Sequence, residues 1–200
     1  MHTNGIIMKK ISLLFACAVF STAIFAQTDV KLGIKAGLNV ASINVEEGEE
    51  TDSRLAPHVG LLAHIHLAPN WALQPEIMYS GQGLENNDFK WKLHYVNIPV
   101  NVQYMFDNGF RLQTGPQVGF LAKGEIDPGD VDLGDDLKKT DVSWTFRHGY
   151  LSYSGFGVDA RYNLGLTNIN EFDESNKATN RVFQVGLFYM FDQAHKAKSR

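Results

Sequence analysis

Apolar and polar residues alternate along most of the chain after its first thirty residues. In YVNIPVNVQY, residues 95–104, the apolar side chains fall on one face of an extended strand and the amides on the other, because successive side chains in a strand point to opposite sides. Runs of about ten such residues, separated by turns or loops, are typical of β-barrels that span a membrane. Eight runs fit this description: 30–43, 55–67, 71–83, 92–106, 110–123, 142–153, 156–167 and 181–191.

The connections between these runs alternate between short and long. The short ones, 68–70, 107–109 and 154–155, contain the Asn, Asp, Ser and Gly residues that favour tight turns. Short turns on one rim and long loops on the other are typical of outer-membrane barrels. The pattern therefore predicts an all-β fold, an eight-stranded antiparallel up-and-down transmembrane β-barrel. The long connections lie near 44–54, 84–91, 124–141 and 168–180.

The N-terminal segment has a different pattern. Basic residues at Lys9 and Lys10 precede the apolar run ISLLFACAVF, and Ala26 is a small residue at a suitable cleavage position, which indicates a secretory signal. Cys17 lies inside this segment, so the mature chain has no cysteine for a disulfide. The predicted organisation is a signal peptide over 1–26, starting at Met1 or Met8, a barrel over 27–191 and a flexible periplasmic tail over 192–200.

Charge and hydropathy exclude two classes of protein, those that bind nucleic acid and those that span a membrane with helices. Without Lys9 and Lys10 the chain has 16 basic and 22 acidic residues, a balance that argues against binding nucleic acid. Of the 22 acidic residues, 17 lie in or beside the four long connections, so the rim that carries them is expected to be acidic. No apolar run after residue 26 approaches the roughly eighteen residues of a membrane helix. Any membrane span must therefore be built from strands.

The two faces of the strands leave two arrangements open. A soluble, lipocalin-like barrel would turn its apolar face into the lumen to bind a small apolar ligand, whereas a membrane barrel turns it outward to lipid. Aromatic residues at the strand ends favour the membrane barrel, because such residues form girdles at the membrane interface. Those beside the predicted short turns are Trp71, Phe106, Phe110, Tyr153, Phe156 and Phe191.

In a membrane barrel the polar face lines the lumen, where charged side chains need partners. We predict that Glu76 and Asp159 pair with Arg161, Arg111 or Lys35 in a polar plug, since eight strands leave an interior that side chains just fill. The expected role of this cluster is structural, in preference to a proton or ion pathway. Arg147 lies on the same face but outside the predicted cluster.

Pro99 interrupts the strand at 95–104 on its polar face. Proline has no backbone N–H to donate, and a closed barrel has no edge strand on which that loss is harmless. We therefore predict a β-bulge or a gap in the hydrogen-bond ladder at Pro99.

Three patterns that could carry chemistry are incomplete. His64 and His66 share a strand face at a spacing that can present two imidazoles to a metal, but the sequence indicates no third ligand. The acidic segment 127–136 lacks glycine where a calcium loop requires it. Ser143 and His148 fall on opposite faces of their strand, and no Gly-x-Ser-x-Gly is present. We expect no enzymatic activity, no cofactor and no dedicated metal site, with weak divalent binding at the acidic rim left open.

Six segments of the chain are specific in combination: GIKAGLNVA (33–41), LQPEIMYSGQG (73–83), YVNIPVNVQYMF (95–106), GPQVGFL (115–121), GVDARYNLGLTNI (157–169) and VFQVGLFYMF (182–191). Together they resemble the outer-membrane β-barrel domain family that includes PorT-like and porin-family proteins. The resemblance implies a small closed barrel in the outer membrane of a Gram-negative cell, and it supplies no catalytic motif. Arg147 and His148 stand where the family usually has small or apolar residues, so the register of 142–153 is the least certain.

The sequence thus favours a non-enzymatic integral outer-membrane barrel with a polar, sealed interior, acidic extracellular loops and a structural or interaction role. Its expected partners are outer-membrane lipid and lipopolysaccharide, the barrel-assembly machinery and a protein that the sequence does not identify. A soluble ligand-binding barrel and a narrow outer-membrane channel remain the alternatives.

Overall fold

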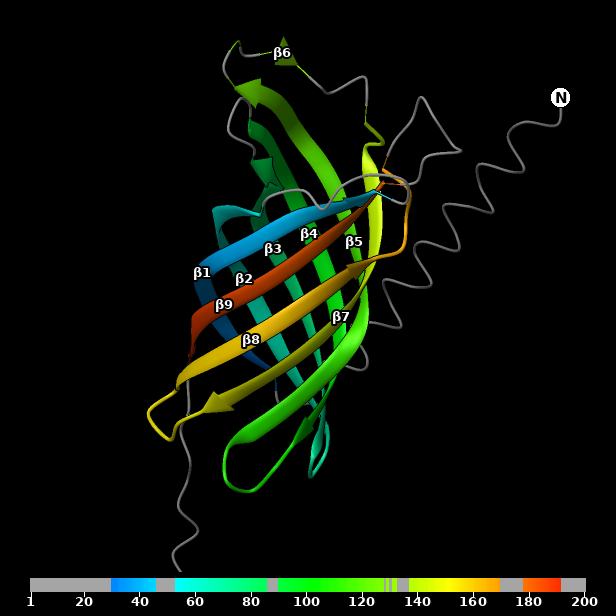
Figure 1. Cartoon of the computed structure of the whole chain (residues 1–200). Coiled ribbons are helices and arrows are strands. Elements are labelled where there is room, and N and C mark those ends of the chain that lie inside the picture. Colours follow the sequence, from blue (N-terminus) through cyan, green and yellow to red (C-terminus); the bar gives the residue numbers. More distant parts are fainter. Residues whose placement is uncertain are drawn as a thin grey trace, which may run out of the picture.

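The computed structural model describes residues 30–45, 53–85, 90–127, 129, 131–132, 137–169 and 178–191. Eight long antiparallel strands close into a barrel, which confirms the predicted fold (Figure 1). The predicted signal peptide and tail lie outside the described residues. Within the described part of the chain, no helix is long and apolar enough to cross a membrane. The long strands are β1 (Val30–Val45), β2 (Arg54–Ala68), β3 (Trp71–Glu85), β4 (Lys90–Met105), β5 (Phe110–Asp127), β7 (Thr140–Leu151), β8 (Phe156–Gly165) and β9 (Ala178–Met190).

One short strand was not predicted. β6 (Val131–Asp132) pairs with Glu125 and Ile126 of β5, inside the connection expected to be a loop over 124–141. The reason is that β5 continues to Asp127, beyond its pairing with β7, and so offers a free edge to the chain that follows it.

Each long strand pairs with the next long strand along the chain, and pairing of β1 with β9 closes the barrel. Tight turns join β2 to β3, β4 to β5 and β7 to β8 at one end, which we call the short-turn rim; the opposite end is the long-connection rim (Figure 1). Gly109 and Gly155 have φ values of 90° and 89° in two of these turns, a backbone region that glycine enters without steric cost. The start of β1 pairs with the end of β9, as Gly33 with Met190, at the short-turn rim.

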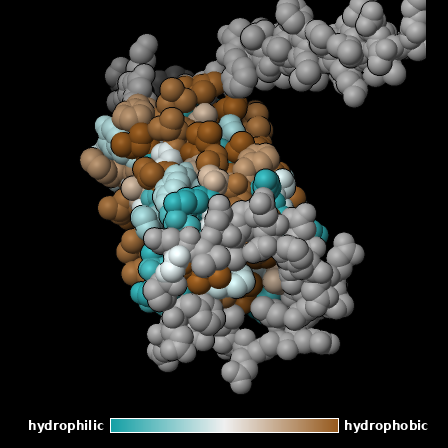
Figure 2. Space-filling view, turned by 90° about the horizontal axis from the view of Figure 1, so that it is seen from above, coloured by the Kyte–Doolittle hydropathy of each residue, from teal (hydrophilic) through white to brown (hydrophobic). Residues whose placement is uncertain are grey.

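The apolar face of the strands points outward. On β4, Ile98, Val100 and Val102 are between 37% and 44% exposed, whereas Asn97 and Asn101 on the other face are buried. Figure 2 shows hydrophobic residues gathered over the outer wall. A soluble barrel with an apolar lumen would need the reverse orientation, so that alternative does not fit the structure.

The outward apolar residues form a band that matches a bilayer. On β5 it runs from Phe110 to Phe120, ten residue steps that rise about 25 Å in a strand tilted by roughly 40°. This is about the height of the apolar band of outer-membrane barrels. The six aromatic residues predicted beside the short turns are all exposed, as in an interfacial girdle: Trp71, Phe106, Phe110, Tyr153, Phe156 and Phe191.

Pro99 lies in a ladder gap and not in a bulge. The β3–β4 register pairs Pro75 with Val100 and then Met78 with Asn97, so the two residues facing Ile98 and Pro99 have no ladder pair. The register between β4 and β5 shifts instead between His94 and Tyr95, where Ala122 of β5 is the extra residue. Because no residue is inserted at Pro99, the inward and outward positions keep the same alternation on both sides of it.

Candidate functional site

The centre of the lumen holds a continuous chain of ion pairs, the charged plug. The Arg147 guanidinium joins the two carboxylates: Nη1 donates to Glu76 Oε1 and Nη2 to Asp159 Oδ2, both at 2.6 Å. Arg161 Nη2 donates to the second oxygen of Glu76 at 2.6 Å. Lys35 Nζ lies 2.9 Å from Asp159 Oδ1 as an ion pair without hydrogen-bond geometry. The plug therefore consists of Lys35, Glu76, Arg147, Asp159 and Arg161.

The plug is removed from solvent on all sides. The side chains of its five members are between 0% and 1% exposed. Gln74 Nε2 donates to Glu76 Oε1 at 2.8 Å, and Arg147 Nη1 also donates to Gln113 at 3.2 Å. The Phe188 ring centroid lies 5.2 Å from the guanidinium carbon of Arg147. With three cations and two carboxylates, these fixed contacts bind the strands together across the lumen.

Four of the five residues predicted to form a lumen cluster meet in the charged plug: Lys35, Glu76, Asp159 and Arg161. Arg111, the fifth, makes no ion pair with Glu76 or Asp159 among the described residues. The register explains the difference, because Gln113 lies opposite Arg147, and Arg111 is one inward position nearer the short-turn rim. Its expected pairing with the acids is corrected accordingly.

Arg147 is the member that sequence reasoning left out. It lies on the inward face of β7, which the alternation of that strand indicates, while His148 beside it points outward. The available signal was parity, since Arg147 shares a face with Ser143 and Thr145. The alternation in the sequence places Arg147 on that face, but the adjacent His148 makes the register of this strand uncertain, because one of two neighbouring polar residues must lie on the lipid side.

An amide network fills the lumen on the long-connection side of the charged plug. Asn39 is its centre: Nδ2 donates to Ser80 Oγ at 2.9 Å, and Oδ1 accepts from Gln184 Nε2 at 2.8 Å. His58 Nδ1 is 2.7 Å from the same Asn39 oxygen. Elsewhere in the lumen Gln113 donates to Gln103 at 2.9 Å. These contacts explain why inward positions carry amides, which form hydrogen bonds without adding charge.

An apolar cluster lies inside the barrel at the long-connection rim. Leu93 and Tyr95 of β4 are fully buried there, and Leu137 and Ile169 come from the long connections themselves. Lys138 N donates to Ile169 O at 3.1 Å, which ties two of the connections together. The buried members of this apolar cap are Ile43, Leu84, Leu93, Tyr95, Leu137 and Ile169.

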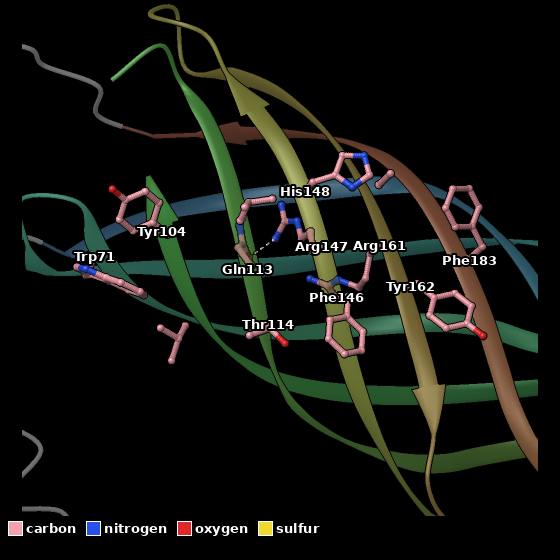
Figure 3. A pocket seen from close by; sticks show the side chains of 13 residues that line it. Trp71, Tyr104, Gln113, Thr114, Phe146, Arg147, His148, Arg161, Tyr162 and Phe183 are labelled. Carbon is pink, nitrogen blue, oxygen red and sulfur yellow. Dashed lines mark hydrogen bonds between the residues drawn. The ribbon is translucent and has the colours of Figure 1, made fainter. Parts of the chain in front are cut away.

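A shallow groove of about 520 Å³ crosses the outer wall. Its exposed walls include Trp71, Phe146 and Phe183, which belong to the outward faces of β3, β7 and β9. Figure 3 shows the hydrogen bond from Arg147 to Gln113 beside Phe146 and His148, the residues that flank Arg147 on β7. Because the groove lies on the apolar band, lipid chains cover it in a membrane.

The three incomplete chemical patterns are placed as follows. His64 and His66 lie with their rings 5.7 Å apart, and the described residues contain no group of three or more His, Cys, Asp or Glu side chains that could hold a metal. Ser143 points into the lumen and His148 outward. Most of the acidic segment 127–136 lies outside the described residues.

At the long-connection rim, beyond the apolar band, Lys92 and Asp127 form an exposed ion pair. Lys92 Nζ donates to Asp127 Oδ2 at 2.6 Å across the β4–β5 pairing. This hydrogen bond and the positive charge of Lys92 hold the pKa of the Asp127 carboxyl below its usual value.

Comparisons with known proteins agree with the geometry. Residues 25–171 match the family described as outer membrane protein beta-barrel domain. The fold is similar to Neisserial surface protein A, with a TM-score of 0.55 and 14% identity over 80% of this chain and 98% of that one. It is also similar to Ail, the attachment invasion locus protein of Yersinia pestis, with a TM-score of 0.52 and 11% identity over 82% of this chain and 99% of that one. Comparison with curated protein sequences gives no match.

Proposed function

Because the chain belongs to the outer membrane protein β-barrel domain family, we propose that it is a sealed, non-enzymatic barrel whose long acidic connections form an interaction surface. It is an integral protein of the outer membrane, in contact with lipid and in the environment of lipopolysaccharide. The charged plug is the observation that carries the proposal, since it occupies the lumen at mid-height with no exposed side chain.

Two further features support a sealed lumen. The interior of an eight-stranded barrel is about wide enough for its own side chains, which leaves no continuous aqueous path. The apolar cap lies above the plug at the long-connection rim, where Leu93 and Tyr95 are fully buried. An ion crossing the barrel would have to break paired charges and then pass through an apolar layer, and both steps are costly.

The described residues support a non-enzymatic role. Ser143 and His148 point to opposite sides of the wall, so they cannot act as a nucleophile and its base. The five titratable groups of the charged plug are held in ion pairs that a substrate would have to displace.

The long-connection rim is the expected interaction surface. In the sequence, 17 of the 22 acidic residues lie in or beside the four long connections. Short turns face the periplasm in outer-membrane barrels, so in this proposal the acidic connections face outward from the cell. Ail has been crystallised with the heparin analogue sucrose octasulfate, a polyanion. The acidic connections of this chain favour the opposite partner, either the divalent cations that bridge lipopolysaccharide or a basic protein surface. Insertion by the barrel-assembly machinery is part of this proposal.

Recordings in planar lipid bilayers test the sealed interior. We expect no discrete conductance steps from protein whose folding is checked by heat-modifiable gel mobility. The double variant in which Glu76 and Arg147 are both replaced by alanine loses two members of the plug. It serves as a positive control, because an opened lumen should give conductance steps. Regular steps from the wild-type protein would contradict the sealed lumen and favour the narrow-channel alternative.

Binding to lipopolysaccharide micelles with and without magnesium tests the interaction surface. A variant with Glu46, Glu47, Glu49 and Glu50 changed to Gln is expected to lose magnesium-dependent binding. Glu171→Gln, a single change in another connection, is the matched control with little expected loss. Equal magnesium-dependent binding by the fourfold variant and the wild type would exclude this rim segment as the cation-dependent contact.

A further inference from the structure

A second cavity lies at the short-turn rim, separate from the charged plug. It has a volume of about 220 Å³ and is bordered by the three short turns, where Asp107, Asn108 and Tyr153 are exposed. Leu151 and Met190 line its inner end and belong to a buried apolar cluster with Leu62 and Phe188. This recess, which we call the vestibule, therefore opens at the rim and ends blindly below the plug.

Basic and imidazole side chains from opposite walls line the vestibule. Lys31 of β1 is paired in register with His64 of β2, and His66 follows on the same strand. Arg111 approaches from β5, which is four strands from β1 and three from β2, and it is a charged neighbour of His64. Among the described residues that line the cavity, Asp107 is the only acid, and it is exposed on its turn.

Two buried nitrogen atoms in the vestibule have no hydrogen-bond partner among the described residues. His64 is only 4% exposed, and its Nδ1 has no hydrogen-bond partner in the described part of the chain. The buried Nε of Arg111 likewise has none, and within the described residues its guanidinium faces no carboxylate. The Nε atoms of Arg147 and Arg161 also have no hydrogen-bond partner, but both guanidinium groups and the ammonium of Lys35 form ion pairs with Glu76 or Asp159. A buried donor without an acceptor is costly, and the His64 tautomer with its proton on Nδ1 adds a second such donor to the guanidinium of Arg111. This arrangement points to an acceptor from outside the chain.

We propose that the vestibule binds a small oxyanion of the phosphate class through Arg111 and His64. Arginine presents a fixed fork of donors that matches phosphate oxygens. The donors come from opposite walls, and the tetrahedral oxygens of a phosphate meet them better than the planar oxygens of a carboxylate. The cavity is smaller than the roughly 300–1,000 Å³ of sites for drug-sized ligands, which suits a small group.

Two sources could supply this group at the periplasmic side of an outer membrane. One is a phosphate or phosphate ester dissolved in the periplasm, and the other is the headgroup of a phospholipid in the inner leaflet. Both present the same phosphate oxygens to Arg111. The proposal does not depend on the sealed lumen or on the acidic rim. The vestibule lies on the short-turn side of the plug, whereas the apolar cap and the acidic connections lie on the long-connection side.

NMR titration of the folded protein in maltoside micelles, which contain no phosphate, tests the proposal. Inorganic phosphate, glycerol phosphate and a short-chain phosphatidylglycerol are added separately, and the amide signals of His64, Gly109 and Arg111 are followed. We expect saturable shifts at these three positions with at least one probe. Arg111→Gln should weaken that binding by about tenfold or more, as loss of a charged hydrogen bond implies. Lys92→Gln, at the other rim, should bind like the wild type.

The probes distinguish the two sources. Saturation by inorganic or glycerol phosphate supports a dissolved ligand, whereas saturation by phosphatidylglycerol alone supports a lipid headgroup. His64→Leu is a second variant that should also weaken binding, and heat-modifiable mobility shows whether each variant is folded. The proposal is overturned if no probe gives saturable shifts or if folded Arg111→Gln and His64→Leu both bind like the wild type. Equal affinity for acetate would overturn the phosphate class.

Discussion

Arg147 and Glu76 are 71 positions apart in the sequence, yet Nη1 of the arginine donates to Oε1 of the glutamate at 2.6 Å in the centre of the barrel. The second nitrogen of the same guanidinium donates to Asp159. One side chain thereby links β3, β7 and β8 across the lumen. Because Arg147 bridges three strands, substitutions in the charged plug should change the free energy of unfolding of the barrel.

Replacing Glu76 with Gln is expected to destabilise the barrel strongly. The change leaves three buried cations facing Asp159 alone, and breaking a buried ion pair from one side typically costs about 3–5 kcal/mol. Unfolding in urea, followed by heat-modifiable mobility in lipid vesicles, measures the loss. Glu85→Gln, in an exposed pair with Lys90, is the matched control and should change the free energy of unfolding by less than about 1 kcal/mol.

Replacing Lys35 with Met should cost less than Glu76→Gln. Removal of this ammonium leaves two cations and two carboxylates, and Asp159 keeps its bond to Arg147. Methionine also fills most of the volume of the lysine stem in a buried position. The same urea experiment ranks the two variants. A larger loss for Lys35→Met would mean that the pair with Asp159, and not the charge balance of the plug, dominates.

A charged residue introduced on the outer wall should destabilise the barrel more, the deeper it lies in the membrane. Val100 lies near the middle of the apolar band, so Val100→Arg is expected to cost about 2–4 kcal/mol in lipid vesicles. For Phe156→Arg, at the short-turn rim, placing the charge at this depth should cost about 1 kcal/mol or less. Loss of the ring contact with Tyr189 adds a separate cost. Equal costs at the two depths would contradict the assigned position of the band.

The Lys92–Asp127 pair predicts a local pH dependence. Because the folded-state pKa of Asp127 is depressed, its contribution to stability is present above the unfolded pKa and is lost as the pH falls through the folded pKa. Titration of the Asp127 carboxyl by NMR should give a midpoint below that of an unpaired aspartate. Lys92→Gln should move the midpoint upward, and an unchanged midpoint would show that the pair is not maintained in solution.

Gly37 is expected to be essential for closure between β1 and β9. A Cβ built at this position would lie 2.1 Å from the Val185 carbonyl oxygen, a contact with backbone that cannot move aside. Gly37→Ala should therefore lower the yield of folded barrel. Ala36→Gly, at the adjacent outward position, is the control and should fold. Normal folding and stability of Gly37→Ala would contradict this close approach.

Much of the fold follows from alternation that acts over short distances. The alternation of apolar and polar residues along YVNIPVNVQY assigned the valines to lipid and the asparagines to the lumen, because successive side chains of a strand point to opposite sides. Parity also placed Lys35, Glu76, Asp159 and Arg161 on the inner face. The ladder gap at Pro99 followed from the missing N–H of proline, whereas the register shift at His94 and Tyr95 had no such local cause.

The sequence by itself determined the number of long strands, their two faces and the asymmetry of the two rims, because each depends on residues within ten or so positions of one another. The tertiary structure decided which inward charges meet. That outcome depends on how each strand is staggered against its neighbours: the stagger places Gln113 opposite Arg147 and moves Arg111 toward the short-turn rim. The same stagger brings Arg147 between Glu76 and Asp159 and leaves Arg111 and His64 in the vestibule. Register is a property of two paired strands, so the sequence of a single strand does not determine it.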